Sequence, residues 1–216
     1  MKIIMAAVVG ASLATPVLAT PDAKILGRTY GEWSARWWEW QDEYYPGFTF
    51  GEGDVSVDCS VGQRGPVWFL GGNGGGTDVR TCNKPIRGNI RLFFPLVNVS
   101  LPKDDPGFCG GSCKEPEQRE ILNGILSEDP PGIFNTQACK LNAWLDDEPA
   151  VFVTPIVRTQ SPPFDYPFEQ GDPPQPGAIS DGYWVMLPPL SSGDHEIRLT
   201  GALCDVDTGE VAFGLD

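Results

Sequence analysis

His195 is the only histidine among the 216 residues, so any Ser-His-Asp or Cys-His hydrolase chemistry would depend on this one side chain. Asp194 and Glu196 flank it and make a catalytic triad conceivable. However, no G-x-S-x-G motif precedes it after residue 19, and it stands between the turn 191–193 and an expected strand. This position favours a histidine at a strand edge over a catalytic base, and a single histidine excludes histidine-rich metal sites.

Two carboxylates that face each other across a groove can hydrolyse a glycosidic bond, and the chain has 29 acidic residues from which to build such a pair. Two regions are the first to consider: the segment before the first cysteine and a proline-rich segment, 161–180. The acidic residues concerned are Asp54 and Asp58 in the former, and Asp165, Glu169 and Asp172 in the latter. The more usual interpretation of such residues is a solvated surface that keeps an exported protein soluble.

Asp205, Asp207 and Glu210 offer oxygen ligands around Gly209, as calcium-binding loops do. The segment lacks the twelve-residue pattern of an EF-hand. A hairpin turn between two strands explains the same residues, because aspartate and glycine both suit the backbone angles of tight turns. The turn is the preferred interpretation, and calcium is the only cofactor that the sequence suggests.

Four of the seven tryptophans lie within residues 33–40. Trp33, Trp37 and Trp40 follow the three-and-four spacing of one helical face, which indicates a buried stripe. An exposed aromatic ring, in contrast, can stack on the apolar face of a sugar. The aromatic residues that a buried face explains least are Trp38, Trp144, Tyr166 and Trp184. These four, together with Asp165 and Glu169, are the candidates for ligand binding.

All six cysteines follow residue 19, and an even number in an exported chain predicts three disulfides. We expect Cys59 to pair with Cys82, because the segment between them resembles a strand pair with a glycine-rich tip. Cys109 and Cys113 can pair with each other or reach separately to Cys139 and Cys204. A zinc site is less favoured, because export promotes oxidation of the thiols.

Two helices are expected. The first begins at Thr29, where Thr29 and Glu32 have the spacing of a capping box. The second begins near Pro116 and presents the apolar residues Ile121, Leu122, Ile125 and Leu126 before two prolines stop it.

Twenty-six glycines and twenty-one prolines divide the remainder into short segments, several of which alternate in polarity. The expected strands are 66–71, 78–82, 90–97, 139–145, 150–157, 183–187, 195–203 and 210–215. Segment 161–180 contains six prolines and is expected to be a loop. We therefore predict a mainly β fold: an antiparallel β-sandwich with one or two covering α-helices, stabilised by disulfides.

Residues 1–19 have the features of a secretory signal peptide: Lys2, an apolar run, and small residues at positions 17 and 19. Residues 20–216 are expected to form a single secreted domain, with a sub-boundary near residue 130 and a sandwich-like C-terminal part. We expect no transmembrane segment, because no later apolar run is long enough. The formal net charge is −14, and −15 without the signal peptide, which disfavours nucleic acid as a partner.

Three motifs together identify a resemblance. They are Tyr30-Gly-Glu-Trp-Ser-Ala-Arg-Trp-Trp-Glu-Trp40, Cys59-x3-Gln63-x-Gly-Pro-Val-Trp-Phe-Leu70 and Asp181-Gly-Tyr-Trp-Val-Met-Leu187-x-Pro-Leu190. The chain resembles a family of uncharacterised secreted proteins of bacterial type. This resemblance covers most of the mature chain and brings no known activity, substrate or catalytic residue. It implies a final sheet that continues past Asp216 with another strand.

The function that these features favour is an exported, envelope-associated or secreted binding protein, with polysaccharide as the first ligand class to test. An alternative is a carbohydrate-active enzyme, either a hydrolase that uses carboxylates or a lyase that uses tyrosine and arginine. A second alternative is a structural surface protein that assembles with itself. The sequence leaves the oligomeric state open, and it does not distinguish the periplasm from the cell exterior.

Overall fold

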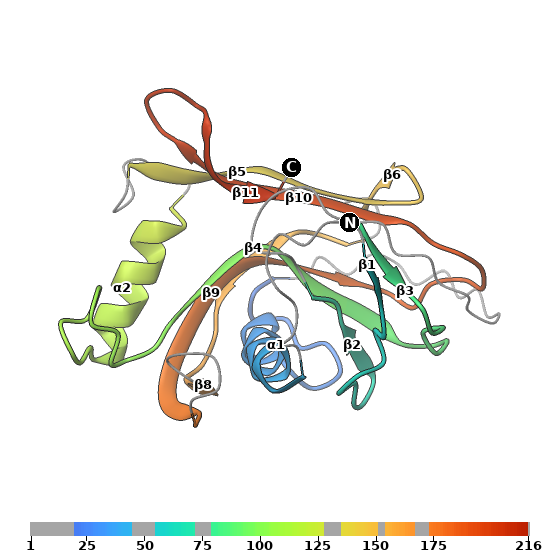
Figure 1. Ribbon diagram of the computed structural model, residues 1–216, viewed down its shortest axis with the longest axis horizontal. Helices are drawn as coiled ribbons and strands as arrows, with labels where there is room; N and C mark the ends of the chain where they lie inside the picture. Colours follow the sequence, from blue (N-terminus) through green and yellow to red (C-terminus); the bar gives the residue numbers. More distant parts are fainter. Residues whose placement is uncertain are drawn as a thin grey trace.

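The computed structural model describes residues 20–44, 55–71, 79–127, 135–150, 154–166 and 173–215. These residues form a mainly β structure with two helices and three disulfides (Figure 1). Two sheets pack face to face as a sandwich, and helix α1 covers the outer face of one of them. The predicted fold class is confirmed.

The first helix, α1 (Tyr30–Tyr44), begins with the expected capping box. The backbone N–H of Thr29 donates to Glu32 Oε2 at 2.7 Å, and the N–H of Glu32 donates to Thr29 Oγ1 at 3.2 Å. Trp33, Trp37 and Trp40 are all buried. The helix therefore docks through its aromatic stripe, and its opposite side carries the charged residues.

The central sheet has the order β2-β4-β9-β7. Its strands are β2 (Val67–Phe69), β4 (Arg91–Leu101), β9 (Gln175–Leu187) and β7 (Val157–Gln160), and β8 (Phe164–Tyr166) also pairs with β9. Strands β4 and β9 are antiparallel over most of their length. Both faces of this sheet are covered, which explains why β9 is buried continuously from Ala178 to Leu187.

The second sheet has the order β11-β10-β5-β6, and all of its pairs are antiparallel. Its strands are β5 (Thr136–Leu145), β6 (Glu148–Pro149), β10 (Ile197–Asp205) and β11 (Val211–Leu215). Ala143, Ile197 and Leu199 pack with Leu92 and Phe94 of the central sheet in one core. The second sheet thus covers the face of the central sheet that lies opposite α1 (Figure 1).

The expected strand pair between Cys59 and Cys82 is wrong. Strand β2 pairs with β4 in parallel, and β3 (Arg80–Cys82) pairs in parallel with β1 (Val55–Val57). Every residue of β2 is buried, because Val67 and Phe69 face α1 while Trp68 faces the sandwich core. Strand β2 is thus an edge strand of the central sheet that is covered on both faces, and β4 supplies the long neighbour that an isolated hairpin lacks.

The disulfide between Cys59 and Cys82 is confirmed. Cys109 pairs with Cys113, which is the local alternative, and the bond between Cys139 and Cys204 joins β5 to β10. Three disulfides are typical of an oxidising, exported compartment. Within the described residues, neither helix is long and apolar enough to cross a membrane.

The second helix, α2 (Glu115–Ile125), has proline in its first turn as expected, and its buried Leu122 and Ile125 face the sheets. The sub-boundary near residue 130 does not separate the sheets, because β4 precedes it and its partner β9 follows it. The loop expected over 161–180 is also wrong where the segment is described. Strand β8 and the start of β9 pair there, with Asp165 opposite Pro176 at an irregularity of the register.

Helix α1 lies directly against β7 at Gly31. A Cβ atom at this position would lie 2.5 Å from the backbone oxygen of Gln160, which cannot move without disturbing β7. We expect Gly31→Ala to lower the free energy of unfolding by about 1–3 kcal/mol, although alanine is the better helix former. Urea denaturation measures this, with the exposed helical variant Arg36→Ala as the control. An unchanged or higher stability of Gly31→Ala would contradict the close contact.

Candidate functional site

An aromatic pair joins the C-terminal half of α1 to strand β8. The rings of Trp38 and Tyr166 lie 5.4 Å apart between centroids, at an interplanar angle of 85°. Both side chains are half-buried, so each keeps an accessible part. The pairing of β8 with β9 brings Tyr166 to the helix side of the sheet, where Phe164 packs against Ala35 and anchors the strand.

Carboxylates surround this aromatic pair. Partial burial raises the pKa of Glu39, and the nearby charge of Asp165 adds to the rise while Arg36 opposes it. Burial also raises the pKa of Asp42, with a further contribution from Glu43. These groups lie at the C-terminal end of α1, where the helix dipole disfavours negative charge as well. The site therefore combines aromatic rings with carboxyl groups that bind protons more readily than usual.

Tyr166 is affected by one of these carboxylates, that of Asp42. Burial raises the pKa of its hydroxyl, and the negative charge of Asp42 raises it further, whereas a hydrogen bond to Ser100 lowers it. The Tyr166 hydroxyl is therefore held neutral, and it remains a hydrogen-bond donor and acceptor.

Four buried polar atoms near this pair have no hydrogen-bond partner among the described residues. They are Trp38 Nε1 and Gln41 Oε1 on α1, Asn98 Nδ2 on β4 and Trp184 Nε1 on β9. Asn98 lies opposite Gly182, where an added Cβ would lie 2.8 Å from Trp184 Nε1, so the strand groups are close neighbours. Buried polar atoms are normally paired, and exceptions commonly mark ordered water or a ligand.

We refer to Trp38, Glu39, Gln41, Asp42, Asp165 and Tyr166 as the α1–β8 site. Its unpaired N–H and C=O groups, together with its carboxylates, both donate and accept hydrogen bonds. Its rings present apolar surface beside them. This combination suits a polyhydroxyl ligand such as a sugar, whose hydroxyls need donors and acceptors and whose ring faces are apolar.

The structure brings together three residues that the sequence proposed for ligand binding: Trp38, Asp165 and Tyr166. Trp184 has no exposed surface, so the expectation that it forms an accessible platform is wrong; it stacks on Phe93 inside the core. Trp144 lies elsewhere, on β5 of the second sheet, with the guanidinium of Arg198 4.7 Å from its ring centroid.

Asp58 is already engaged in an ion pair. A hydrogen bond from Lys84, helped by one from Ser60, lowers the pKa of Asp58 to about 2. This carboxylate is therefore held in the charged form as a partner of Lys84. The remaining acidic residues that the sequence singled out for hydrolysis, Asp54, Glu169 and Asp172, lie outside the described residues.

Asp205 closes the turn between β10 and β11, as the hairpin interpretation expects. Its Oδ1 accepts the backbone N–H groups of Asp207 at 3.0 Å and Thr208 at 2.8 Å, and the Thr208 bond is the main reason that the pKa of Asp205 is lowered. Asp207 Oδ2 accepts instead from Asn135. Within the described part of the chain, no three metal-ligating side chains cluster, Asp205, Asp207 and Glu210 included.

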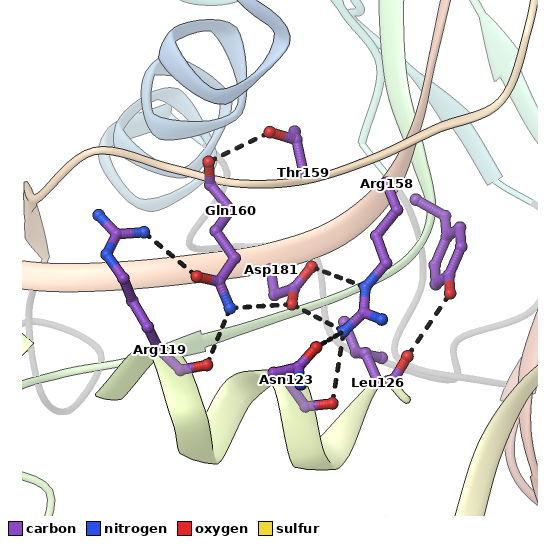
Figure 2. Close-up of polar contacts among 8 residues, drawn as sticks. Arg119, Asn123, Leu126, Arg158, Thr159, Gln160 and Asp181 are labelled. Atoms are coloured by element: carbon purple, nitrogen blue, oxygen red, sulfur yellow. Dashed lines mark hydrogen bonds and ion pairs between the residues drawn. The ribbon is translucent and has the colours of Figure 1, made fainter. Parts of the chain in front are cut away.

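A second polar cluster links α2 to the central sheet (Figure 2). Asp181 is 1% exposed, and Arg158 donates to its two carboxylate oxygens at 3.3 and 3.0 Å. Gln160 Nε2 donates to Asp181 Oδ2 at 3.2 Å and to the carbonyl of Arg119 on α2 at 2.9 Å. Burial nevertheless raises the pKa of Asp181, against the effect of Arg158.

Arg158 in this cluster also lies over the ring of Tyr183, 5.7 Å from its centroid. A tyrosine beside an arginine is the pair that the lyase alternative requires. However, the Tyr183 hydroxyl donates to the carbonyl of Leu126, and Arg158 also donates to Asn123 Oδ1 at 3.1 Å. Because these groups bind one another and α2, the cluster acts as a structural connection.

Sequence reasoning missed Glu39, Gln41 and Asp42. The spacing of Gln41 and Asp42 from Trp38 was a usable signal, since residues three and four positions apart on a helix share a face, whereas Glu39 at the next position carried no such signal. No family model, curated protein or solved structure matches this chain.

Proposed function

We propose that this chain is an exported glycan-binding protein, acting in the periplasm or outside the cell, and that the α1–β8 site holds the sugar. The observation that carries the proposal is the half-buried Trp38–Tyr166 pair, with an unpaired indole N–H and raised-pKa carboxyl groups beside it. A sugar ring stacks on the exposed part of such a pair, and its hydroxyls form hydrogen bonds with the neighbouring carboxyl groups.

The charge of the protein narrows the ligand class. The formal net charge is −14, and the acidic residues Glu39, Asp42 and Asp165 lie at the site itself. An anionic polysaccharide would be repelled, whereas carboxylates accept hydrogen bonds from neutral sugar hydroxyls. We therefore expect neutral glycans to bind more tightly than uronates or sulfated chains.

Removing either ring tests the proposal. Tyr166→Ala and Trp38→Ala are each expected to weaken binding of a neutral polysaccharide about tenfold, which corresponds to about 1.4 kcal/mol. Affinity electrophoresis or calorimetry against a polysaccharide panel measures the change. Trp144→Ala is the matched control, because it removes an aromatic residue from the second sheet and should bind normally. If both variants stay folded and bind like the parent, the proposal fails.

The raised pKa of Glu39 favours one alternative, a glycoside hydrolase in which Glu39 is the general acid. The same panel separates the two functions, because hydrolysis releases reducing ends whereas binding does not. If the parent protein releases reducing ends and Glu39→Gln does not, the protein is a glycoside hydrolase that uses Glu39.

A further inference from the structure

The only histidine lies in a Ser-His-Asp arrangement that its sequence neighbours did not indicate. Ser191 Oγ lies 3.3 Å from His195 Nε2, and His195 Nδ1 lies 2.6 Å from Asp146 Oδ2. The carboxylate is thus neither Asp194 nor Glu196, which flank the histidine in the sequence. The imidazole side chain is only 10% exposed, while Ser191 is open to solvent.

The backbone fixes Asp146 in place. Asp146 and Asp147 connect β5 to β6 in a two-residue turn, with φ values of 53° and 67° as a type I′ hairpin requires. Asp146 Oδ1 accepts the N–H of Glu196 at 2.9 Å, and the N–H of Asp146 donates to the carbonyl of Glu196. One carboxylate oxygen is therefore held by the backbone just before β10, which leaves Oδ2 directed at His195.

We propose that Ser191, His195 and Asp146 form a catalytic triad that hydrolyses small, accessible carboxylic esters. The order of contacts is the one that nucleophilic serine chemistry needs: hydroxyl to one ring nitrogen, carboxylate to the other. This activity is separate from the proposed glycan binding, since it uses other residues on other elements.

Nε2 contacts two oxygens of Ser191, the hydroxyl Oγ at 3.3 Å and the carbonyl oxygen at 3.0 Å, so its role depends on the tautomer. When Nδ1 carries its proton toward Asp146, Nε2 is an acceptor, and the Ser191 hydroxyl is its donor. After Nε2 has taken the serine proton, its N–H can donate to the carbonyl oxygen of Ser191, which lies 3.0 Å away. Asp146 and this carbonyl thus both stabilise the imidazolium that forms.

The ester carbonyl also needs donors for its developing negative charge. The N–H groups of Ser192 and Gly193 follow the nucleophile directly, and neither donates to another described residue. Backbone N–H groups beside a nucleophile are the usual form of an oxyanion hole.

The reaction balances with water as the only co-substrate. Ser191 Oγ attacks the ester carbonyl as its proton passes to Nε2; the carbon–alkoxy bond then breaks, and the leaving alcohol takes that proton. Water attacks the acyl-serine, gives a proton to Nε2, and the carbon–Oγ bond breaks as Oγ is reprotonated. The products are one carboxylic acid and one alcohol.

The experiment uses the full chain with p-nitrophenyl acetate and with a fluorophosphonate probe. We expect the probe to label Ser191, located by peptide mass spectrometry of the unmodified sequence. Ser191→Ala and Asp146→Asn should each lower p-nitrophenyl acetate turnover about 100-fold or more. Ser112→Ala and Asp147→Asn are the controls, because they change an exposed serine outside the proposed site and the aspartate beside Asp146, and both should retain turnover.

Two results would overturn the triad. One is the absence of a label on Ser191, which needs no variant and so does not depend on whether a variant folds. The other is a Ser191→Ala protein that folds and turns over the ester as fast as Ser112→Ala, since the hydrolysis would then come from elsewhere on the surface.

Discussion

Replacing Trp184 with alanine is expected to cost about 3–5 kcal/mol of folding free energy, a large part of the roughly 5–15 kcal/mol that holds a domain of this size together. Trp184 has no exposed surface. Its ring stacks on Phe93 at a centroid distance of 5.0 Å and meets the edge of Trp37 at 5.5 Å. Truncation would leave a cavity between α1 and the central sheet, where rigid strands prevent collapse.

Equilibrium denaturation in urea, followed by tryptophan fluorescence and circular dichroism, measures this loss. Trp144→Ala is again the control, because that indole is half-buried beneath Arg198 and its loss should cost much less. If both substitutions cost the same, the aromatic layer under α1 does not form the core described above.

The second large loss of folding free energy is expected when Arg158 is replaced. Its guanidinium is the counter-charge of Asp181, whose side chain is 2% exposed. Arg158→Met leaves a charged carboxylate buried without its cation, and removal of one partner of a buried pair costs about 3–5 kcal/mol. We expect the connection between α2 and the sheet to weaken and the free energy of unfolding to fall by this amount at pH 7.

This loss should depend on pH in a direction that the pKa of Asp181 fixes. Burial already raises the pKa of Asp181, and loss of Arg158 raises it further. A carboxyl whose folded pKa is raised contributes stability below its unfolded pKa of about 3.9, and that contribution is lost as the pH rises through the folded value. Arg158→Met should therefore approach the parent stability near pH 4 and differ most at neutral pH.

A double variant tests whether the buried carboxylate of Asp181 causes the stability loss of Arg158→Met. Arg158→Met combined with Asp181→Asn carries no buried charge, and the amide can still accept a hydrogen bond from Gln160. We expect it to be more stable than Arg158→Met alone at pH 7, as judged by urea denaturation. If the double variant is the less stable of the two, the cost comes from lost packing of the arginine stem and not from the buried carboxylate.

The features that the sequence predicted correctly are those with local causes. The capping box at Thr29 and Glu32 and the spacing of the tryptophans lie within a few turns of one helix, so they identified α1 and its buried face. The parallel pairing of β2 with β4 was not predictable in this way. The partner of β2 is a strand that lies later in the sequence, so no local pattern identifies it. The glycine-rich segment after β2 suggested a hairpin instead.

The α1–β8 site shows the same division. Trp38, Asp165 and Tyr166 were recognisable by residue type, but Glu39 and Asp42 looked like ordinary solvated charges on the outer side of a helix. Their raised pKa values come mainly from partial burial in the fold, and for Glu39 also from the charge of Asp165, which β8 brings near. In the same way, Asp146 lies beside His195 because of the turn between β5 and β6, which the sequence around His195 does not reveal. The flanking residues Asp194 and Glu196 are therefore not its carboxylate partners.

The pairing of β4 with β9 constrains how this protein folds. Leu92 lies opposite Leu187, and the segments that meet there are separated by nearly half of the chain. Closing so long a loop carries a large entropic cost, and non-local pairing of this kind slows folding. The pairing of β4 with β9 therefore cannot form until β9 has been synthesised, late in translation. Such a delay suits a chain whose disulfides form only after it has reached an oxidising compartment.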